Sequence, residues 1–252
     1  MTGARFRTIA DDVRERIALG DLGDSGALES EAVLGQRYGA SRVTVRRALE
    51  LLREQGLVES RQGSGWFVAG GSFHQTLALG TFRHASSAVL DSGRKLSRRV
   101  ASFAYEVPPA AVGTSLRLAA GDEALHSRSV RTVDDVPLDL VQEWVPAPLA
   151  GRLSRADAAD PGIWPSLQRD GHRVASVRQS ITAGVASDQD AGLLGVDPGT
   201  ALLLVRRLAL ARDGGPVALS DHRYLAHRFS LEVEFNGWPT ADEPPGLRTV
   251  PD

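Results

Sequence analysis

The chain has 252 residues and a formal net charge of -2, so it is long enough for two domains and is not a polycation that coats nucleic acid indiscriminately. It contains no cysteine, which excludes disulfides and thiolate metal sites. Its first residues carry no apolar signal segment, and no apolar run is long enough to cross a bilayer. We therefore expect a cytoplasmic protein with no membrane partner.

The N-terminal part predicts two helices in succession. Apolar residues at helical spacing indicate an amphipathic helix from about Phe6 to Leu19, followed by a loop. Ser30 caps a second, short helix that extends to Tyr38. The residues of this helix expected to face inward are Ala32, Val33 and Leu34. Gly39 then makes a tight turn, which is the spacing of a helix-turn-helix.

A third helix and a hairpin follow this turn. Ser41 stands where an N-cap oxygen accepts from the first free amides of the helix. The apolar residues expected to return at helical spacing are Val43, Ala48, Leu49 and Leu52. The runs Leu57–Arg61 and Trp66–Val68 predict two short strands around a Gly-rich loop. Three helices and a hairpin together predict a winged helix.

Arginines gather near the start of the third helix. Arginine forks bridge phosphates or hold guanine edges, and a helix N-terminus carries a partial positive charge, so this pattern indicates a DNA recognition helix. The residues predicted to contact DNA are Ser41, Arg42, Thr44, Arg46, Arg47, Gln62 and Gly63. The alternative is an ordinary amphipathic helix with a solvated arginine face.

Four segments of this part carry a resemblance to a known family. They are Leu28-Glu29-Ser30-Glu31, Ala40-Ser41-Arg42-Val43-Thr44-Val45-Arg46-Arg47-Ala48-Leu49, Gly56-Leu57-Val58 and Gly63-Ser64-Gly65-Trp66-Phe67-Val68. In these segments the chain resembles the GntR superfamily of bacterial transcription regulators. The resemblance implies a winged helix-turn-helix that binds double-stranded DNA. The family usually has proline where Glu29 stands, which implies a less rigid entry to the second helix.

Composition divides the chain after this part. The Gly-rich stretch 69–72 predicts a short linker. We place the DNA-binding domain at residues 1–69, the linker at 70–75 and a second domain at 76–235. The tail 236–252 is rich in proline and has no apolar period, so we expect it to be disordered.

The second domain reads as many strands with few helices, which predicts an α+β fold built on an antiparallel sheet. The predicted strands are Val100–Val107, Ala124–Val133, Leu138–Val145, Arg173–Ala183, Ala201–Ala211 and Pro216–Tyr224. The predicted helices are Ser86–Gly93, Ile163–Gly171 and Ser187–Leu194.

This domain resembles the UTRA effector domain of the HutC-like branch of GntR regulators. The segments that carry the resemblance are Leu125–Pro137, Glu143-Trp144-Val145-Pro146, Leu193–Leu203, Asp213–Val217 and Arg228-Phe229. The resemblance implies a fold related to chorismate lyase, the sensing of a small-molecule effector, and homodimerisation. A homodimer would place two recognition helices on an inverted repeat of the operator.

The resemblance also implies which residues hold the effector. Ser86 and Ser87 match a helix start where amides and a hydroxyl hold an acidic group, so we expect an anionic effector. The alternative for Ser86 is that it only caps its helix. The residues predicted to bind the effector are Ser86, Ser87, Arg131, Glu143 and Tyr224.

The chain departs from the family pattern at two of the positions that contact the effector. The family has a pair of arginines one residue apart. Here Arg131 fits the second, Ser129 replaces the first, and Arg128 falls on the other face of the strand because strand side chains alternate. Val141 stands where the family has an acidic residue, and Glu143 has the same face parity and could substitute. These departures predict an effector other than an amino-sugar phosphate.

Three classes of function remain open. The first is a repressor whose operator binding an effector modulates, with no cofactor. The second is an enzyme, suggested only by the fold shared with chorismate lyase, and we find no nucleophile with a base and no metal motif. The third is a DNA-binding structural protein that ignores small molecules. Turnover of chorismate would support the second class, and the absence of any stabilising ligand would support the third.

Overall fold

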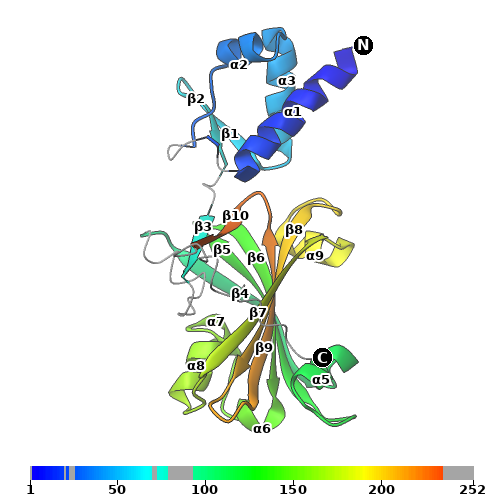
Figure 1. Cartoon of the computed structure of the whole chain (residues 1–252), viewed down its shortest axis with the longest axis vertical. Helices are drawn as coiled ribbons and strands as arrows, with labels where there is room; N and C mark the ends of the chain where they lie inside the picture. The colour runs from blue at the N-terminus through cyan, green and yellow to red at the C-terminus, as the bar shows by residue number, and fades with distance from the viewer. Residues whose placement is uncertain (1, 20, 23–25, 70–72, 79–92, 235–252) are drawn as a thin grey trace, which may run out of the picture.

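The computed structural model describes residues 2–19, 21–22, 26–69, 73–78 and 93–234. They form a helical N-terminal part and a larger part built on a β-sheet, which lie at opposite ends of the molecule in Figure 1. None of the described helices is both long and apolar enough to cross a membrane.

The N-terminal part is a winged helix, as predicted. Helices α1 (Thr2–Leu19), α2 (Glu31–Arg37) and α3 (Arg42–Glu54) precede the strands β1 (Val58–Arg61) and β2 (Gly65–Val68), which pair antiparallel. Helix α1 packs on α3. One hydrophobic core joins both helices to the wing, and at its centre lie Ala10, Val45, Ala48, Leu49 and Leu52, each 0% exposed.

Two predictions about inward-facing residues of this part were wrong. Val43 is 79% exposed, whereas Val45 is 0% exposed. Residues 45, 48, 49 and 52 share one side of the helix at 100° per residue, which places residue 43 away from the core. Val33 is 45% exposed, and Leu34 alone of the three predicted residues of α2 is buried. Three consecutive helical residues span 200°, so they cannot all face inward.

The second part contains a six-stranded sheet that is antiparallel throughout, in the order β4-β5-β6-β9-β8-β7. Its strands are β4 (Leu96–Glu106), β5 (Ala124–Val133), β6 (Val136–Pro146), β7 (Ser176–Val185), β8 (Ala201–Leu210) and β9 (Pro216–Leu225). A separate parallel pair joins β3 (Phe73–Ala78) to β10 (Phe229–Glu234). The α+β prediction is therefore confirmed.

Helices cover both faces of the sheet. One face, which we call the α8 face, carries α6 (Ala147–Ala150), α7 (Arg155–Ala159) and α8 (Ile163–Arg169) at one end, around a core that includes Leu125, Val145 and Ala209. The α9 face carries α5 (Ala110–Ser115) at one end and α9 (Asp188–Leu194) at the other. Figure 1 shows α5 and α9 separated along the sheet, with the central strands between them.

Some boundaries differ from the prediction. Strand β3 begins at Phe73, so three residues predicted as linker belong to a strand. The short helices α5, α6 and α7 and the strand β10 were not predicted, because a helix of four to six residues has too few positions to show a period. Most of the predicted helix 86–93 and the predicted tail 236–252 lie outside the described residues.

One side chain bridges the two parts. Arg228, in the turn between β9 and β10, donates from Nη1 to the carbonyl of Pro137 at 3.0 Å and from Nη2 to the carbonyl of Gly56 at 3.3 Å. Gly56 ends the turn after α3 with φ of +69°, a conformation that favours glycine. Burial lowers the pKa of Arg228. Arg228 thereby connects the β5–β6 hairpin to the turn that ends α3.

The corrected register of α3 gives a matched pair of variants. Val45→Ala should destabilise the N-terminal part by about 1 to 3 kcal/mol, because it leaves a cavity in the core. Val43→Ala should change stability by less than about 0.5 kcal/mol, because Val43 is exposed. Hydrogen exchange of the α3 amides measures both effects in the full chain. Equal loss of protection in the two variants would contradict this register.

Candidate functional site

The start of α3 is built around Ser41. Its Oγ accepts from the backbone N–H of Thr44 at 3.2 Å and lies 2.9 Å from Thr44 Oγ1. This cap satisfies one of the free amides in the first turn of the helix. Thr44 is only 9% exposed, so the structure places it in support of the cap, with little access for DNA.

Three arginines of α3 that were predicted to contact DNA lie on its exposed side. They are Arg42, Arg46 and Arg47. Arg46 donates from Nε and Nη2 to the two carboxylate oxygens of Glu31 in α2, at 2.9 and 3.0 Å. These bonds from Arg46 lower the pKa of Glu31. The guanidinium of Arg47 lies over the ring of Phe6, 4.4 Å from its centroid.

The wing lies beside this helix. Gln62 and Gly63 form the exposed tip of the hairpin, and Gly63 has φ of +74° with no atom within 4 Å of where a Cβ would stand. A bare backbone at such a tip can approach a groove closely. Arg61 is held by Glu59 at 2.8 Å and lies over the ring of Phe67. The structure thus places Gln62 and Gly63 at the open end of the wing.

A band of polar residues, buried except for the half-buried Arg98, crosses the α8 face between two apolar cores. Its members, which we call the polar band, are Arg98, Arg131, Asp139, Glu143, Arg207, Ser220 and His222. Its centre is a two-pronged ion pair in which Arg131 Nε and Nη2 donate to Asp139 at 2.8 and 2.6 Å. Burial by itself would raise the pKa of Asp139, but Arg131 and His222 outweigh it, and the pKa is lowered.

His222 and Tyr224 complete the centre of the band. The hydroxyl of Tyr224 accepts from Arg131 Nη2 at 3.1 Å, and His222 Nδ1 lies 3.0 Å from Asp139 Oδ2. Burial holds the pKa of His222 well below its ordinary value, so the ring is neutral. Donation from Nδ1 to Asp139 then leaves Nε2 to accept from Arg207 Nη1 at 3.2 Å.

A cavity of about 110 Å³ opens between the polar band and the start of α8. Its charged walls include Arg98 and Glu143, whose Nη1 and Oε2 atoms lie 3.0 Å apart. Burial raises the pKa of Glu143 despite the opposing effect of Arg98. The other lining residues are Leu96, Ser97, Arg131, Ala159, Asp160, Pro161, Ile163, Trp164, Pro165, Ser220 and His222. The cavity therefore offers polar groups on the sheet side and apolar groups on the helix side.

The structure brings together only some of the predicted effector residues. Arg131 and Glu143 both line the cavity. Tyr224 lies behind it, 0% exposed, with its ring stacked on Phe229 at 3.7 Å. Ser86 and Ser87 lie outside the described residues.

The residues at which the chain departs from the family pattern can be placed on the faces of the sheet. Val141 lies on the α8 face, directly opposite Ser129, and carboxylates stand two residues away on either side, at Asp139 and Glu143. Arg128 points to the α9 face, as predicted from alternation, and pairs there with Asp190 of α9 at 2.6 Å. The acidic side chains thus flank the position where the family pattern has one.

Sequence reasoning missed Arg98, Asp139 and Trp164. Asp139 shares its parity with Glu143 in the same predicted strand, so strand alternation could have found it. Arg98 lies before the predicted start of its strand, and Trp164 reaches the cavity only through the packing of α8.

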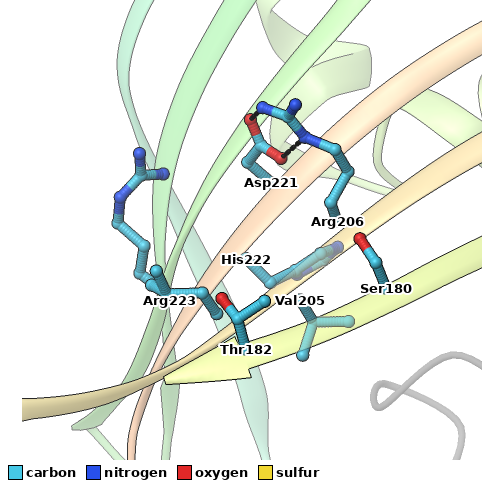
Figure 2. Close-up of a pocket in the computed structure, with 8 residues that line it drawn as sticks. Ser180, Thr182, Val205, Arg206, Asp221, His222 and Arg223 are labelled. Carbon is cyan, nitrogen blue, oxygen red and sulfur yellow. Dashed lines mark hydrogen bonds and ion pairs between the residues drawn. The ribbon is translucent and has the colours of Figure 1, made fainter. Parts of the chain in front are cut away.

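A second hollow lies on the α9 face, and Figure 2 draws the residues that line it. It has a volume of about 290 Å³, and its lining residues are Ser180, Thr182, Leu204, Val205, Arg206, Asp221, His222 and Arg223. Arg206 donates from Nε and Nη2 to Asp221 at 2.7 and 2.8 Å, while Arg223 extends away from this pair. None of the predicted effector residues lines this hollow.

The neutral state of His222 predicts how stability depends on pH. The unfolded chain binds a proton at this residue as the pH falls through about 6.5, whereas the folded chain does not. The stabilisation is therefore complete above that pH and is lost below it, by about 1.4 kcal/mol per pH unit. His222→Gln should remove this one-proton slope from the wild-type profile. Urea unfolding between about pH 6.5 and pH 5 measures it, and identical slopes in the two proteins would refute a neutral His222.

Family models match both parts of the chain. The model described as "Bacterial regulatory proteins, gntR family" matches residues 6–68, and the model described as "UTRA domain" matches residues 91–230. The first range contains α3 and the wing, and the second contains the six-stranded sheet with the polar band.

Curated relatives and solved structures agree with these matches. The regulator Rv0792c of Mycobacterium tuberculosis is 32% identical over 89% of this chain and 84% of its own length. The mannosyl-D-glycerate transport/metabolism system repressor MngR of Escherichia coli is 35% identical over 57% of this chain and 59% of its own length. The structure of PhnF from Mycobacterium smegmatis covers 91% of this chain and all of its own, with a TM-score of 0.59 at 20% identity, and so shares the fold. The chain belongs to the GntR family of bacterial transcription regulators, which are not enzymes, and carries a UTRA domain of the kind that binds effectors.

Proposed function

We propose that this chain is a cytoplasmic repressor that binds an inverted-repeat operator as a homodimer and leaves it when a small polar effector enters the cavity beside the polar band. The observation that carries the DNA-binding half is the capped start of α3 with its exposed arginines Arg42, Arg46 and Arg47 beside the tip of the wing. A helix placed in this way enters a major groove, and the hairpin reaches the adjacent backbone.

Specific recognition here rests on a small patch. The whole chain carries a net charge of -2, so long-range attraction to DNA is weak. Glu31 holds Arg46 in one orientation through two bonds, which reduces the entropy that the side chain loses when it meets a base or phosphate. The relative MngR, which is named as a repressor, supports the direction of regulation.

The effector half is supported by the chemistry of the cavity. Arg98 offers hydrogen-bond donors and Glu143 offers acceptors within one small space, and the apolar side near Ile163 and Trp164 excludes water. A molecule with several hydroxyls and one carboxylate fits such walls. The name of MngR refers to mannosyl-D-glycerate, so sugar-derived acids are the first class of compound to test.

A substitution of Arg46 tests the proposal that α3 binds DNA. Arg46→Ala should weaken binding to the specific operator by about 1 to 3 kcal/mol and leave the fold intact, because Arg46 is exposed on the reading side of α3. Arg169→Ala is the matched control, since Arg169 is also exposed and paired with a carboxylate but lies in the sensing domain. Gel-shift titration compares them. Unchanged affinity of Arg46→Ala would remove this residue from the interface.

Substitutions of two arginines on opposite faces of the sheet test where the effector binds. A compound that binds the cavity beside the polar band should raise the melting temperature by about 2 to 4 °C for each kcal/mol of stabilisation. Arg98→Gln should abolish this shift and the release from operator, without changing DNA affinity in the absence of the compound. Arg206→Gln, in the hollow of Figure 2, should keep both responses. The reverse pattern would move the effector to the α9 face.

A further inference from the structure

An exposed apolar side chain stands at the start of α3. Val43 is the second residue of this helix and is 79% exposed, the largest exposed fraction among the large apolar side chains of the described residues. Valine is a poorer helix former than alanine, and a side chain so exposed adds little to the core. The stability of the fold therefore does not explain why valine stands at this position.

The exposed neighbours of Val43 on the helix are arginines. Residues three and four positions apart lie on the same side of a helix, so Arg46 and Arg47 flank Val43, and Arg42 precedes it. Among the described residues in the first two turns of α3, Val43 is the only exposed one that is apolar. Thr44 also carries a methyl group, but it is 9% exposed and its hydroxyl lies against the cap. One apolar side chain thus stands within a surface of positive charge.

The major groove of DNA offers one apolar group to such a side chain. Hydrogen-bond donors and acceptors line this groove at every base pair, and among the four bases only thymine adds a methyl group. The residues at the start of a recognition helix are the ones that reach base edges. A valine placed against donors and acceptors would desolvate them without giving a hydrogen bond, which costs free energy. Contact with a methyl group instead removes apolar surface of both partners from water.

We propose that Val43 contacts the 5-methyl group of a thymine in each half of the operator and thereby specifies that base. This inference rests on the proposed function, in which α3 enters the major groove. Arginine forks bind any phosphate as well as guanine edges, so the arginines around Val43 do not select thymine. The methyl group also marks the strand that carries the thymine, so this contact distinguishes T·A from A·T.

The first test uses an operator that the full chain selects from random duplex DNA. Each thymine of this operator is replaced in turn by deoxyuridine, which lacks only the 5-methyl group. At least one symmetry-related pair of thymines should respond, with affinity falling about threefold to fivefold for each half-site, as expected when one methyl group is left out of contact. Gel-shift titration at fixed salt measures the affinities, because phosphate contacts make them depend on salt.

The same series with Val43→Ala identifies the residue that makes the contact. Alanine lacks the two γ-methyl groups that reach the base, so the variant should bind thymine and deoxyuridine at the sensitive pair with affinities that differ by less than about 1.5-fold. The substitution leaves the fold intact because Val43 is exposed. Val107→Ala is the matched control, since Val107 is also an exposed valine but lies just beyond β4 in the sensing domain. It should keep the wild-type response to every replacement.

Two outcomes overturn the contact and leave the proposed function standing. One is a selected inverted repeat in which no thymine responds to deoxyuridine. The other is a sensitive thymine whose response is the same in Val43→Ala as in the wild-type chain. If the wild-type chain selects no duplex sequence at all, both the proposed function and the contact are overturned.

Discussion

The ion pair between Arg131 and Asp139 is the interaction on which the sensing domain depends. Both side chains are buried, 1% and 0% exposed, and a buried charge without its partner costs several kcal/mol. The pair forms only when β5 and β6 are in this register and when β9 brings His222 and Tyr224 to the same place. The polar band thus selects one arrangement of three strands, while the apolar cores on either side supply the burial.

The same strands lead toward the DNA-binding domain. Asp139 follows Pro137 in β6 by two residues, and the carbonyl of Pro137 accepts from Arg228, which also reaches the carbonyl of Gly56 at the end of α3. Glu143, which lines the proposed effector cavity, lies in the same strand β6 as Pro137. The proposed effector cavity and the end of α3 are therefore joined by a continuous physical connection through β6 and the turn after β9.

The parts of this molecule that sequence predicted are those with a local physical cause. Ser41 caps α3 because a hydroxyl before an apolar period satisfies free amides, and Arg128 and Arg131 separate to opposite faces because strands alternate. Val43 was misplaced because one apolar residue early in a helix fits more than one stripe, and only packing against α1 selects Val45. The partner of Arg131 and the Arg98–Glu143 pair depend on strand order and register, which no local pattern contains.

Glu31 connects elements of the DNA-binding domain, as the Arg131–Asp139 pair connects strands of the sheet. It accepts two bonds from Arg46 of α3 and one from Trp66 Nε1 of the wing at 3.2 Å, so one carboxylate connects α2, α3 and the wing. The bonds from Arg46 lower the pKa of Glu31, which keeps the carboxylate ionised at neutral pH. If Arg46 contacts DNA as proposed, the ionised carboxylate beside it will repel a phosphate that arrives out of register. On the proposed function, Arg46 then binds only a site that presents an acceptor at the right position, and the DNA-binding domain discriminates by geometry because the net charge of the chain offers little attraction.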